Sequence, residues 1–178
     1  MFSKLLAFGL GALAVVRAAP SLSFQTQYLS CSVNLDGSVA TVKSFDALEP
    51  GKYTIWNDGL HPPGPLYAYS PDSLLMAGPA SVSPTIWSIT PSGNPGSNQY
   101  TITASNIGTK VSKGMIVSTT GQSDSFTISP AGEGRFTIQV PNEDEVWSVY
   151  SAGVASASNV FLQPEMGEID SRWTFVAV

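Results

Sequence analysis

Tyr53-Thr54-Ile55 is the first of six triplets in which an aromatic residue is followed by Thr or Ser and then by a bulky apolar residue. Three copies open a segment, namely Tyr53-Thr54-Ile55, Tyr100-Thr101-Ile102 and Phe136-Thr137-Ile138. Three copies close one, namely Trp87-Ser88-Ile89, Phe126-Thr127-Ile128 and Trp173-Thr174-Phe175. Self-similarity at a period of about 20–50 residues indicates copies of one supersecondary unit. Three irregular copies favour a small closed β structure with pseudo-threefold symmetry.

Short alternating apolar runs, bounded by turn-forming residues, fill each of the three units. This pattern is typical of an all-β chain with regularly spaced strands. It predicts strands at about 51–56, 66–69, 74–77 and 85–90, then 98–104, 108–112, 115–119 and 125–129, and finally 134–140, 146–150, 159–163 and 172–177. Twelve strands in three four-strand copies predict a β-trefoil, in which six strands close a barrel and six form a hairpin cap. Closure removes the free sheet edges that invite aggregation.

The start of the chain has the features of a secretory signal peptide. Lys4 precedes an apolar run from Leu5 to Val16, and Ala18 ends a small-residue cleavage pattern. The run of about twelve residues is short for a membrane span of roughly twenty. We therefore expect residues 1–18 to be a signal peptide, residues 19–47 to be an extension or propeptide, and residues 48–178 to form the β-trefoil domain of a secreted protein.

Charge and cysteine usage narrow the classes of partner. Without Lys4 and Arg17 the chain keeps six basic and thirteen acidic side chains, a net charge of about −7. No basic cluster occurs, so we expect neither nucleic-acid binding nor attraction to an anionic membrane. Cys31 is the only cysteine, which excludes an internal disulfide. The thiol is then either buried and inert, which is the simpler interpretation, or paired with a second chain in a covalent dimer. We expect a monomer.

Three phrases resemble the β-trefoil serine-protease inhibitors of mushrooms, the cospin and cnispin type. They are Leu48-Glu49-Pro50-Gly51-Lys52-Tyr53-Thr54-Ile55, Trp87-Ser88-Ile89 and Arg172-Trp173-Thr174-Phe175. The likeness covers roughly residues 48–178. It implies a rigid exposed loop that enters a serine or cysteine protease in a substrate-like manner. The family's best-known reactive loop lies between the second and third strands of the first unit, where this chain has Ser70-Pro71-Asp72-Ser73.

A trypsin-like target requires a basic primary side chain, because its specificity pocket holds a carboxylate. The Ser70–Ser73 loop has no basic residue, and the nearby Leu74, Leu75 and Met76, which would suit a chymotrypsin-like pocket, have a strand pattern. In the second unit, Lys113-Gly114 occupies a predicted hairpin tip and Lys110 lies nearby. The candidates for an inhibitory loop are therefore Lys113, Gly114 and Lys110 of the second unit and Ser70, Pro71, Asp72 and Ser73 of the first. A solvated turn lysine is the simpler interpretation of Lys113.

Carbohydrate binding is the alternative function, because many β-trefoils are lectins. Such sites combine a carboxylate or amide with an aromatic face. The Gln-x-Trp phrase of ricin-type lectins is missing at all three closing strands. Asp58, Trp56 and His61 are candidates for one site in the first unit, and Trp147 with Glu145 for another in the third.

Catalysis is not expected from this sequence. His61 is the only histidine, and no nucleophile-elbow sequence surrounds it. One His and one Cys cannot form a usual zinc site. The densest acid run, Glu143-Asp144-Glu145, lacks calcium-loop spacing and is predicted to be a solvated turn. We expect no metal and no cofactor.

Overall fold

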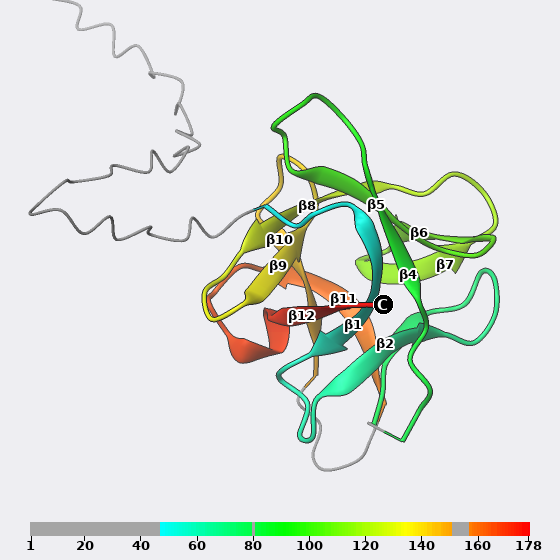
Figure 1. Ribbon diagram of the computed structural model, residues 1–178. Helices are drawn as coiled ribbons and strands as arrows, with labels where there is room; N and C mark the ends of the chain where they lie inside the picture. The colour runs from blue at the N-terminus through cyan, green and yellow to red at the C-terminus, as the bar shows by residue number, and fades with distance from the viewer. Residues whose placement is uncertain (1–46, 80, 151–156) are drawn as a thin grey trace, which may run out of the picture. The chain divides into compact units, whose positions relative to one another are not determined.

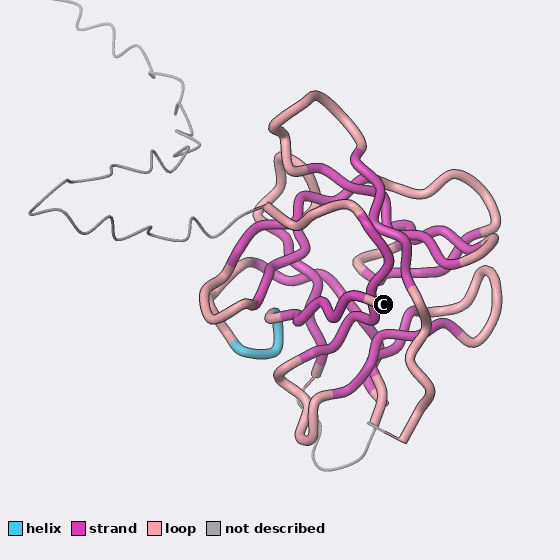
Figure 2. Tube along the Cα trace, viewed as in Figure 1, coloured by secondary structure: helices cyan, strands magenta, loops and turns pink. Residues whose placement is uncertain are grey.

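A computed structural model describes residues 47–79, 81–150 and 157–178 (Figure 1). The predicted signal peptide, nearly all of the predicted extension, and Cys31 lie outside the described residues. The described chain is all-β apart from one short 3-10 helix (Figure 2). None of its helices is long and apolar enough to cross a membrane.

All twelve predicted strands are present, with ends that differ from the predicted ones by at most two residues. The first unit contains β1 (Gly51–Asn57), β2 (Gly64–Ala68), β3 (Leu75–Ala77) and β4 (Trp87–Pro91). The second contains β5 (Gln99–Ala104), β6 (Ile107–Ser112), β7 (Met115–Thr119) and β8 (Ser125–Pro130). The third contains β9 (Arg135–Gln139), β10 (Glu145–Val149), β11 (Ser158–Pro164), the helix η1 (Ile169–Ser171) and β12 (Trp173–Ala177).

Six strands close into a ring of antiparallel ladders. Within the units, β1 pairs with β4, β5 with β8, and β9 with β12. Between units, β4 pairs with β5, β8 with β9, and β12 with β1. The prediction that the opening and closing strands of each unit form a barrel is therefore confirmed.

The six repeated triplets occupy equivalent positions in this barrel. Within each unit, the aromatic residue of the opening strand lies opposite that of the closing strand, giving the pairs Tyr53–Trp87, Tyr100–Phe126 and Phe136–Trp173. Between units, the third residues lie opposite each other, giving Ile89–Ile102, Ile128–Ile138 and Phe175–Ile55. Residues two apart on a strand point to the same face. The motif therefore supplies two successive layers of the barrel.

The closing aromatics form the centre of the hydrophobic core. Trp87, Phe126 and Trp173 are fully buried. The indole Nε1 of Trp87 donates to the backbone oxygen of Leu66 over 3.1 Å, and that of Trp173 donates to the backbone oxygen of Trp147 over 3.0 Å. A buried indole needs such an acceptor. Burying one large apolar side chain contributes about 1.5–3 kcal/mol, so this layer is a principal source of stability.

The remaining strands form three hairpins, β2–β3, β6–β7 and β10–β11, which also contact one another. β11 pairs with both β3 and β7, and an isolated bridge joins Leu74 to Val117. These contacts place the β2–β3 loop of the first unit against a strand of the second unit.

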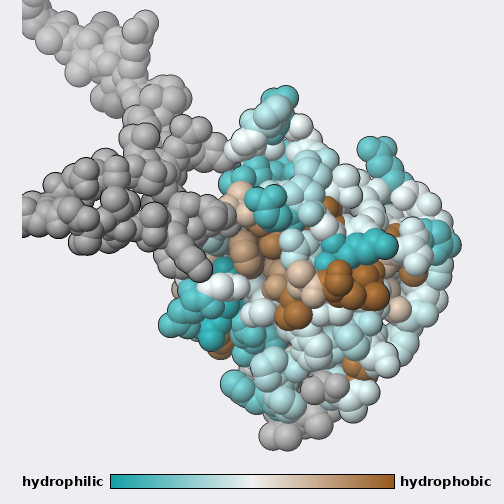
Figure 3. Space-filling view, viewed as in Figure 1, coloured by the Kyte–Doolittle hydropathy of each residue, from teal (hydrophilic) through white to brown (hydrophobic). Residues whose placement is uncertain are grey.

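The end of the barrel where β1 begins and β12 ends has aromatic rings at its rim. Phe175 makes edge-to-face contacts with Tyr53 and Phe136, with ring centroids 5.8 and 5.4 Å apart. In the space-filling view the surface is largely polar, and apolar side chains gather near the C-terminus (Figure 3). Val176 and Val178 are exposed there. The hairpins and the aromatic rim thus occupy different parts of the molecule.

Candidate functional site

The loop Ser70–Ser73 connects β2 to β3 and presents its tip to solvent. Pro71 and Asp72 are both exposed. Asp72 has a φ of 58°, the left-handed conformation required at the third position of a type II turn, and proline is favoured just before it. The predicted inhibitory loop of the first unit is therefore a tight, outward-facing turn.

A buried serine of the second unit fixes this turn. The Oγ of Ser118, which is fully buried in β7, donates to the carbonyl oxygen of Ser70 at 2.7 Å or to that of Ser73 at 3.0 Å. The same oxygen accepts the backbone N–H of Ser73 at 3.0 Å. The backbone N–H of Ser118 donates to the oxygen of Ser73 over 2.8 Å, and the Oγ of Ser73 donates to the oxygen of Ser70. Both ends of the turn are thus tied to β7, a strand of the second unit's hairpin.

Two exposed apolar side chains flank the turn. Tyr69 is 74% exposed and directly follows β2, while Leu74 is 38% exposed and directly precedes β3. The Tyr69 ring stands edge-to-face on the Tyr67 ring at 5.0 Å, and their hydroxyls lie 3.2 Å apart. Burial and then the hydrogen bond with Tyr69 raise the pKa of the Tyr67 hydroxyl, so it stays protonated to a higher pH than an ordinary tyrosine. Leu75 is fully buried and Met76 half-buried, which removes Leu75 as a pocket-filling side chain.

The predicted hairpin tip at Lys113-Gly114 is confirmed. Lys113 and Gly114 have φ values of 53° and 74°, and Ser112 lies directly opposite Met115. This is the two-residue turn whose central residues both need positive φ. The chain folds back on itself directly after β6, so the backbone of Lys113 itself is left-handed and not extended. Lys110 is exposed but lies within the β6–β7 ladder, opposite Val117.

The predicted sugar site of the first unit is partly assembled. Asp58 Oδ2 accepts from Thr174 Oγ1 at 3.0 Å and pairs with Arg135 Nε at 3.1 Å. Trp56 lies opposite Thr174 across the β1–β12 ladder, and its indole donates to Thr54 Oγ1. Asp58 and Trp56 therefore share Thr174 as a neighbour. His61 is exposed in the β1–β2 connection.

The prediction for Trp147 is wrong. Its side chain is fully buried and stands edge-to-face against Phe126 and Trp173, with ring centroids 4.8 and 6.2 Å away. An aromatic ring enclosed in this way cannot stack on a sugar. Glu145 is half-buried at the start of β10, while Glu143 and Asp144 are exposed, as expected for a solvated turn.

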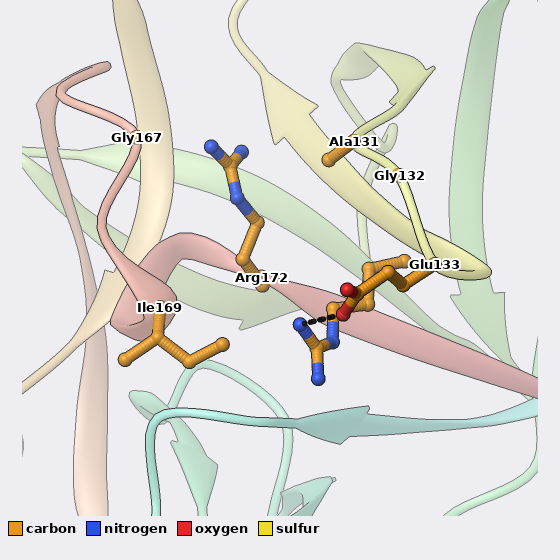
Figure 4. Close-up of a pocket in the computed structure, with 7 residues that line it drawn as sticks. Ala131, Gly132, Glu133, Gly167, Ile169 and Arg172 are labelled. Carbon is orange, nitrogen blue, oxygen red and sulfur yellow. Dashed lines mark hydrogen bonds and ion pairs between the residues drawn. The ribbon is translucent and has the colours of Figure 1, made fainter.

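A polar pocket of about 430 Å³ lies between the β8–β9 turn and the β11–β12 connection (Figure 4). Its lining residues are Ala131, Gly132, Glu133, Arg135, Gly167, Ile169 and Arg172. Arg135 Nη1 pairs with Glu133 Oε2 at 2.8 Å, and Arg172 Nη2 pairs with Glu165 Oε1 at 3.0 Å. Sequence reasoning missed this pocket because its two sides are separated along the chain and meet only through the β9–β12 ladder.

The pocket offers donors and acceptors together. Two guanidinium groups are balanced by the carboxylates of Glu133, Glu165 and Asp58, so the surroundings do not favour a free anion. Within the described ranges, no group of three His, Cys, Asp or Glu side chains could hold a metal ion.

The sequence matches no family model and no curated protein. Its structure is similar to the designed threefold-symmetric protein ThreeFoil, with a TM-score of 0.60 and 14% identity over 72% of this chain and 99% of that one. It is similar to a proteinase inhibitor from Coprinopsis cinerea, with a TM-score of 0.60 and 14% identity over 74% and 99% of the two chains. It is also similar to the Rhizoctonia solani agglutinin, with a TM-score of 0.59 and 16% identity over 76% and 100%.

At these identities the likeness shows the fold alone. Twelve strands in three units, closed as described above, make the chain a β-trefoil. The expected resemblance to a mushroom inhibitor is confirmed at the level of fold.

Proposed function

We propose that this protein is a secreted protease inhibitor that presents the loop between Tyr69 and Leu74 to a serine protease in a substrate-like manner. The observation that supports it most strongly is the attachment of the Ser70–Ser73 turn to the buried Ser118. The fold is shared with a proteinase inhibitor and with an agglutinin, so the proposal depends on the loop.

Rigidity is the property that an inhibitory loop requires. A flexible loop loses conformational freedom on binding, whereas a preorganised loop avoids most of that entropy loss and binds more tightly. Here the hydrogen bonds come from a different unit and from a side chain with no exposure. The turn therefore keeps its shape without the protease. The protein acts by occupying a cleft, as a monomer, and performs no catalysis of its own.

The proposed inhibitory loop is the Ser70–Ser73 loop of the first unit and not the Lys113-Gly114 tip of the second. Lys113 itself and the following Gly114 both have positive φ, whereas in the first-unit loop the positive φ falls at Asp72, three residues after Tyr69. We therefore place the inhibitory contact in the first unit and expect trypsin-like enzymes to be poor targets.

An inhibition panel tests the proposal. The whole protein is titrated against chymotrypsin-like, trypsin-like, subtilisin-like and papain-like enzymes, with residual activity as the readout. Stoichiometric inhibition of at least one serine protease is expected. Failure against every enzyme of the panel would exclude protease inhibition through this loop.

Carbohydrate binding is the second candidate, and the pocket beside Asp58 is the observation that favours it. Its size lies in the range of small-molecule sites, and its mixed donors and acceptors suit a neutral polyhydroxylated ligand. A glycan array with the whole protein and the Glu133→Gln variant tests it. Signals for neutral glycans that weaken in the variant would favour a lectin, and an empty array would remove this alternative.

A further inference from the structure

Tyr69 is the most prominent apolar side chain near the proposed inhibitory loop. Its exposed fraction is 74%, the second highest among the large hydrophobic residues of the described chain. It lies at the point where β2 ends and the fixed turn begins. A side chain that enters a protease pocket has to project from a backbone that is held on both sides, and Tyr69 meets this condition.

A series of close contacts supports Tyr69. Its ring stands on Tyr67 at 5.0 Å with an interplanar angle of 85°, and the two hydroxyls share a hydrogen bond. Tyr67 is 4% exposed and packs on Gly78, where an added Cβ would lie 2.4 Å from Tyr67 Cε1. Tyr69 is therefore supported by a fixed aromatic residue, so fewer rotamers are lost when it is buried.

The backbone on the N-terminal side of Tyr69 has the conformation of a bound substrate. Leu66, Tyr67 and Ala68 belong to β2 and are extended, with β3 on one side. On the other side, the ladder with β1 contains only Gly64 and Pro65 among the described residues. Leu66 and Tyr67 are buried, and the oxygen of Leu66 accepts the indole N–H of Trp87. A protease strand can therefore form main-chain hydrogen bonds only from the half-buried Ala68 onward.

The other side chains of the loop fit less well. Asp72 is acidic and has a left-handed backbone, so it lacks the extended geometry of a cleavable segment. Leu74 is half as exposed as Tyr69 and is bridged to Val117. Asp72 and Leu74 are therefore weaker candidates than Tyr69.

From this geometry we infer that Tyr69 is the primary specificity residue of the loop and that the target is a chymotrypsin-like serine protease. The specificity pocket of such enzymes is a hydrophobic slot that accepts large apolar side chains. The inference rests on the proposed function and adds to it the class of target and the residue that selects it.

The test uses chymotrypsin and trypsin as probes, with inhibition constants measured for the wild type and three variants of Tyr69. The wild type inhibits chymotrypsin, and Tyr69→Ala weakens this inhibition by about 30-fold or more, as expected for a central interface residue. Tyr69→Phe retains it. Tyr69→Lys no longer inhibits chymotrypsin and inhibits trypsin instead, because the trypsin pocket holds a carboxylate.

Tyr150→Ala is the matched control, because Tyr150 is 66% exposed and stacks on Phe161 in the third unit. It should leave both constants unchanged. Thermal unfolding of each variant checks the fold, which the removal of an exposed ring should barely change.

The outcomes separate the two claims. If the wild type inhibits no serine protease, the proposed function and this inference are both rejected. If it inhibits chymotrypsin and Tyr69→Ala does so equally well, or if it inhibits trypsin in preference, the inhibitor function stands and the assignment of Tyr69 is overturned.

Discussion

The backbone nitrogen of Ser73 donates to the side-chain oxygen of Ser118 over 3.0 Å, and this bond joins the loop of one unit to a strand of the next. The two residues are 45 positions apart in the sequence. The shape of the exposed turn is therefore determined by a buried residue that no protease would touch.

Ser118→Ala should release this turn. The variant leaves the part-buried backbone N–H of Ser73 without its acceptor, which costs about 1–3 kcal/mol of folding stability. The backbone oxygens of Ser70 and Ser73 each keep one donor, the Oγ of Ser73 and the N–H of Ser118. We expect weaker protease inhibition through faster dissociation, because the freed loop has to be ordered on binding. Inhibition constants and thermal unfolding measure the two effects.

Ser171→Ala is the control for Ser118→Ala. Ser171 is also fully buried, and its Oγ donates to the oxygen of Glu168 over 2.8 Å, away from the loop. It should lower stability with little change in inhibition. Equal weakening of inhibition by both variants would argue against a positioning role for Ser118.

Lys113→Ala should leave inhibition of every protease in the panel unchanged. Lys113 lies in a two-residue turn with a φ of 53°, and the backbone oxygen of the following Gly114 accepts the N–H of Leu162 at 2.8 Å. The tip therefore belongs to the hairpin cap and is not extended. A loss of trypsin inhibition in this variant would contradict the proposal and would show that the inhibitory loop lies in the second unit.

Ile128→Ala should destabilise the barrel strongly. Ile128 is fully buried and lies opposite Ile138, and removing a large aliphatic side chain from a core costs about 2–5 kcal/mol. Val176→Ala on β12, where the side chain is 49% exposed, should change stability by about 0.5 kcal/mol or less. Chemical denaturation of both variants tests the assignment, and equal effects would contradict it.

Asp170→Asn should stabilise the protein at neutral pH. Burial, followed by smaller contributions that include the charge of Glu168, raises the pKa of the Asp170 carboxyl. The folded state therefore keeps this proton to a higher pH than the unfolded state. The resulting stability is fully present below about pH 4, the unfolded value, and is lost as the pH rises through the raised value.

The asparagine variant carries no such titration, so its advantage over the wild type should grow from acidic to neutral pH. Free energies of unfolding across this range provide the measurement. Asp144→Asn, in an exposed turn, controls for the loss of one negative charge. An advantage that is constant with pH would show that Asp170 does not titrate in this way.

The barrel could be predicted from the sequence because its signal is local and repeated. Each triplet places an aromatic residue and a second bulky apolar residue on one face of a strand, and proline ends the closing strands of the first two units at Pro91 and Pro130. The turn at Lys113-Gly114 has an equally local signal. Such features survive in a single sequence because they depend on neighbouring residues alone.

The errors concern residues whose surroundings come from distant parts of the chain. The sequence predicts Trp147 at a binding surface, but β10 is buried on both faces from Val146 to Val149. The alternation of apolar and polar residues does not reveal that a second face is covered. The sequence also predicts Tyr69 at the end of the second strand, whereas β2 ends one residue earlier, at Ala68. The proline two residues after Tyr69 is the one local signal that could have indicated the earlier end.

The ladder between β12 and β1 places Ala177 opposite Tyr53, and the N–H of Val178 donates to the oxygen of Lys52 over 3.1 Å. The fold therefore does not depend on which of the three units comes first along the chain, because each is joined to the next by the same kind of antiparallel ladder. A circular permutant that joins Val178 to Ala47 through a short linker, so that the buried Leu48 is kept, and begins at β5 should assemble the same fold.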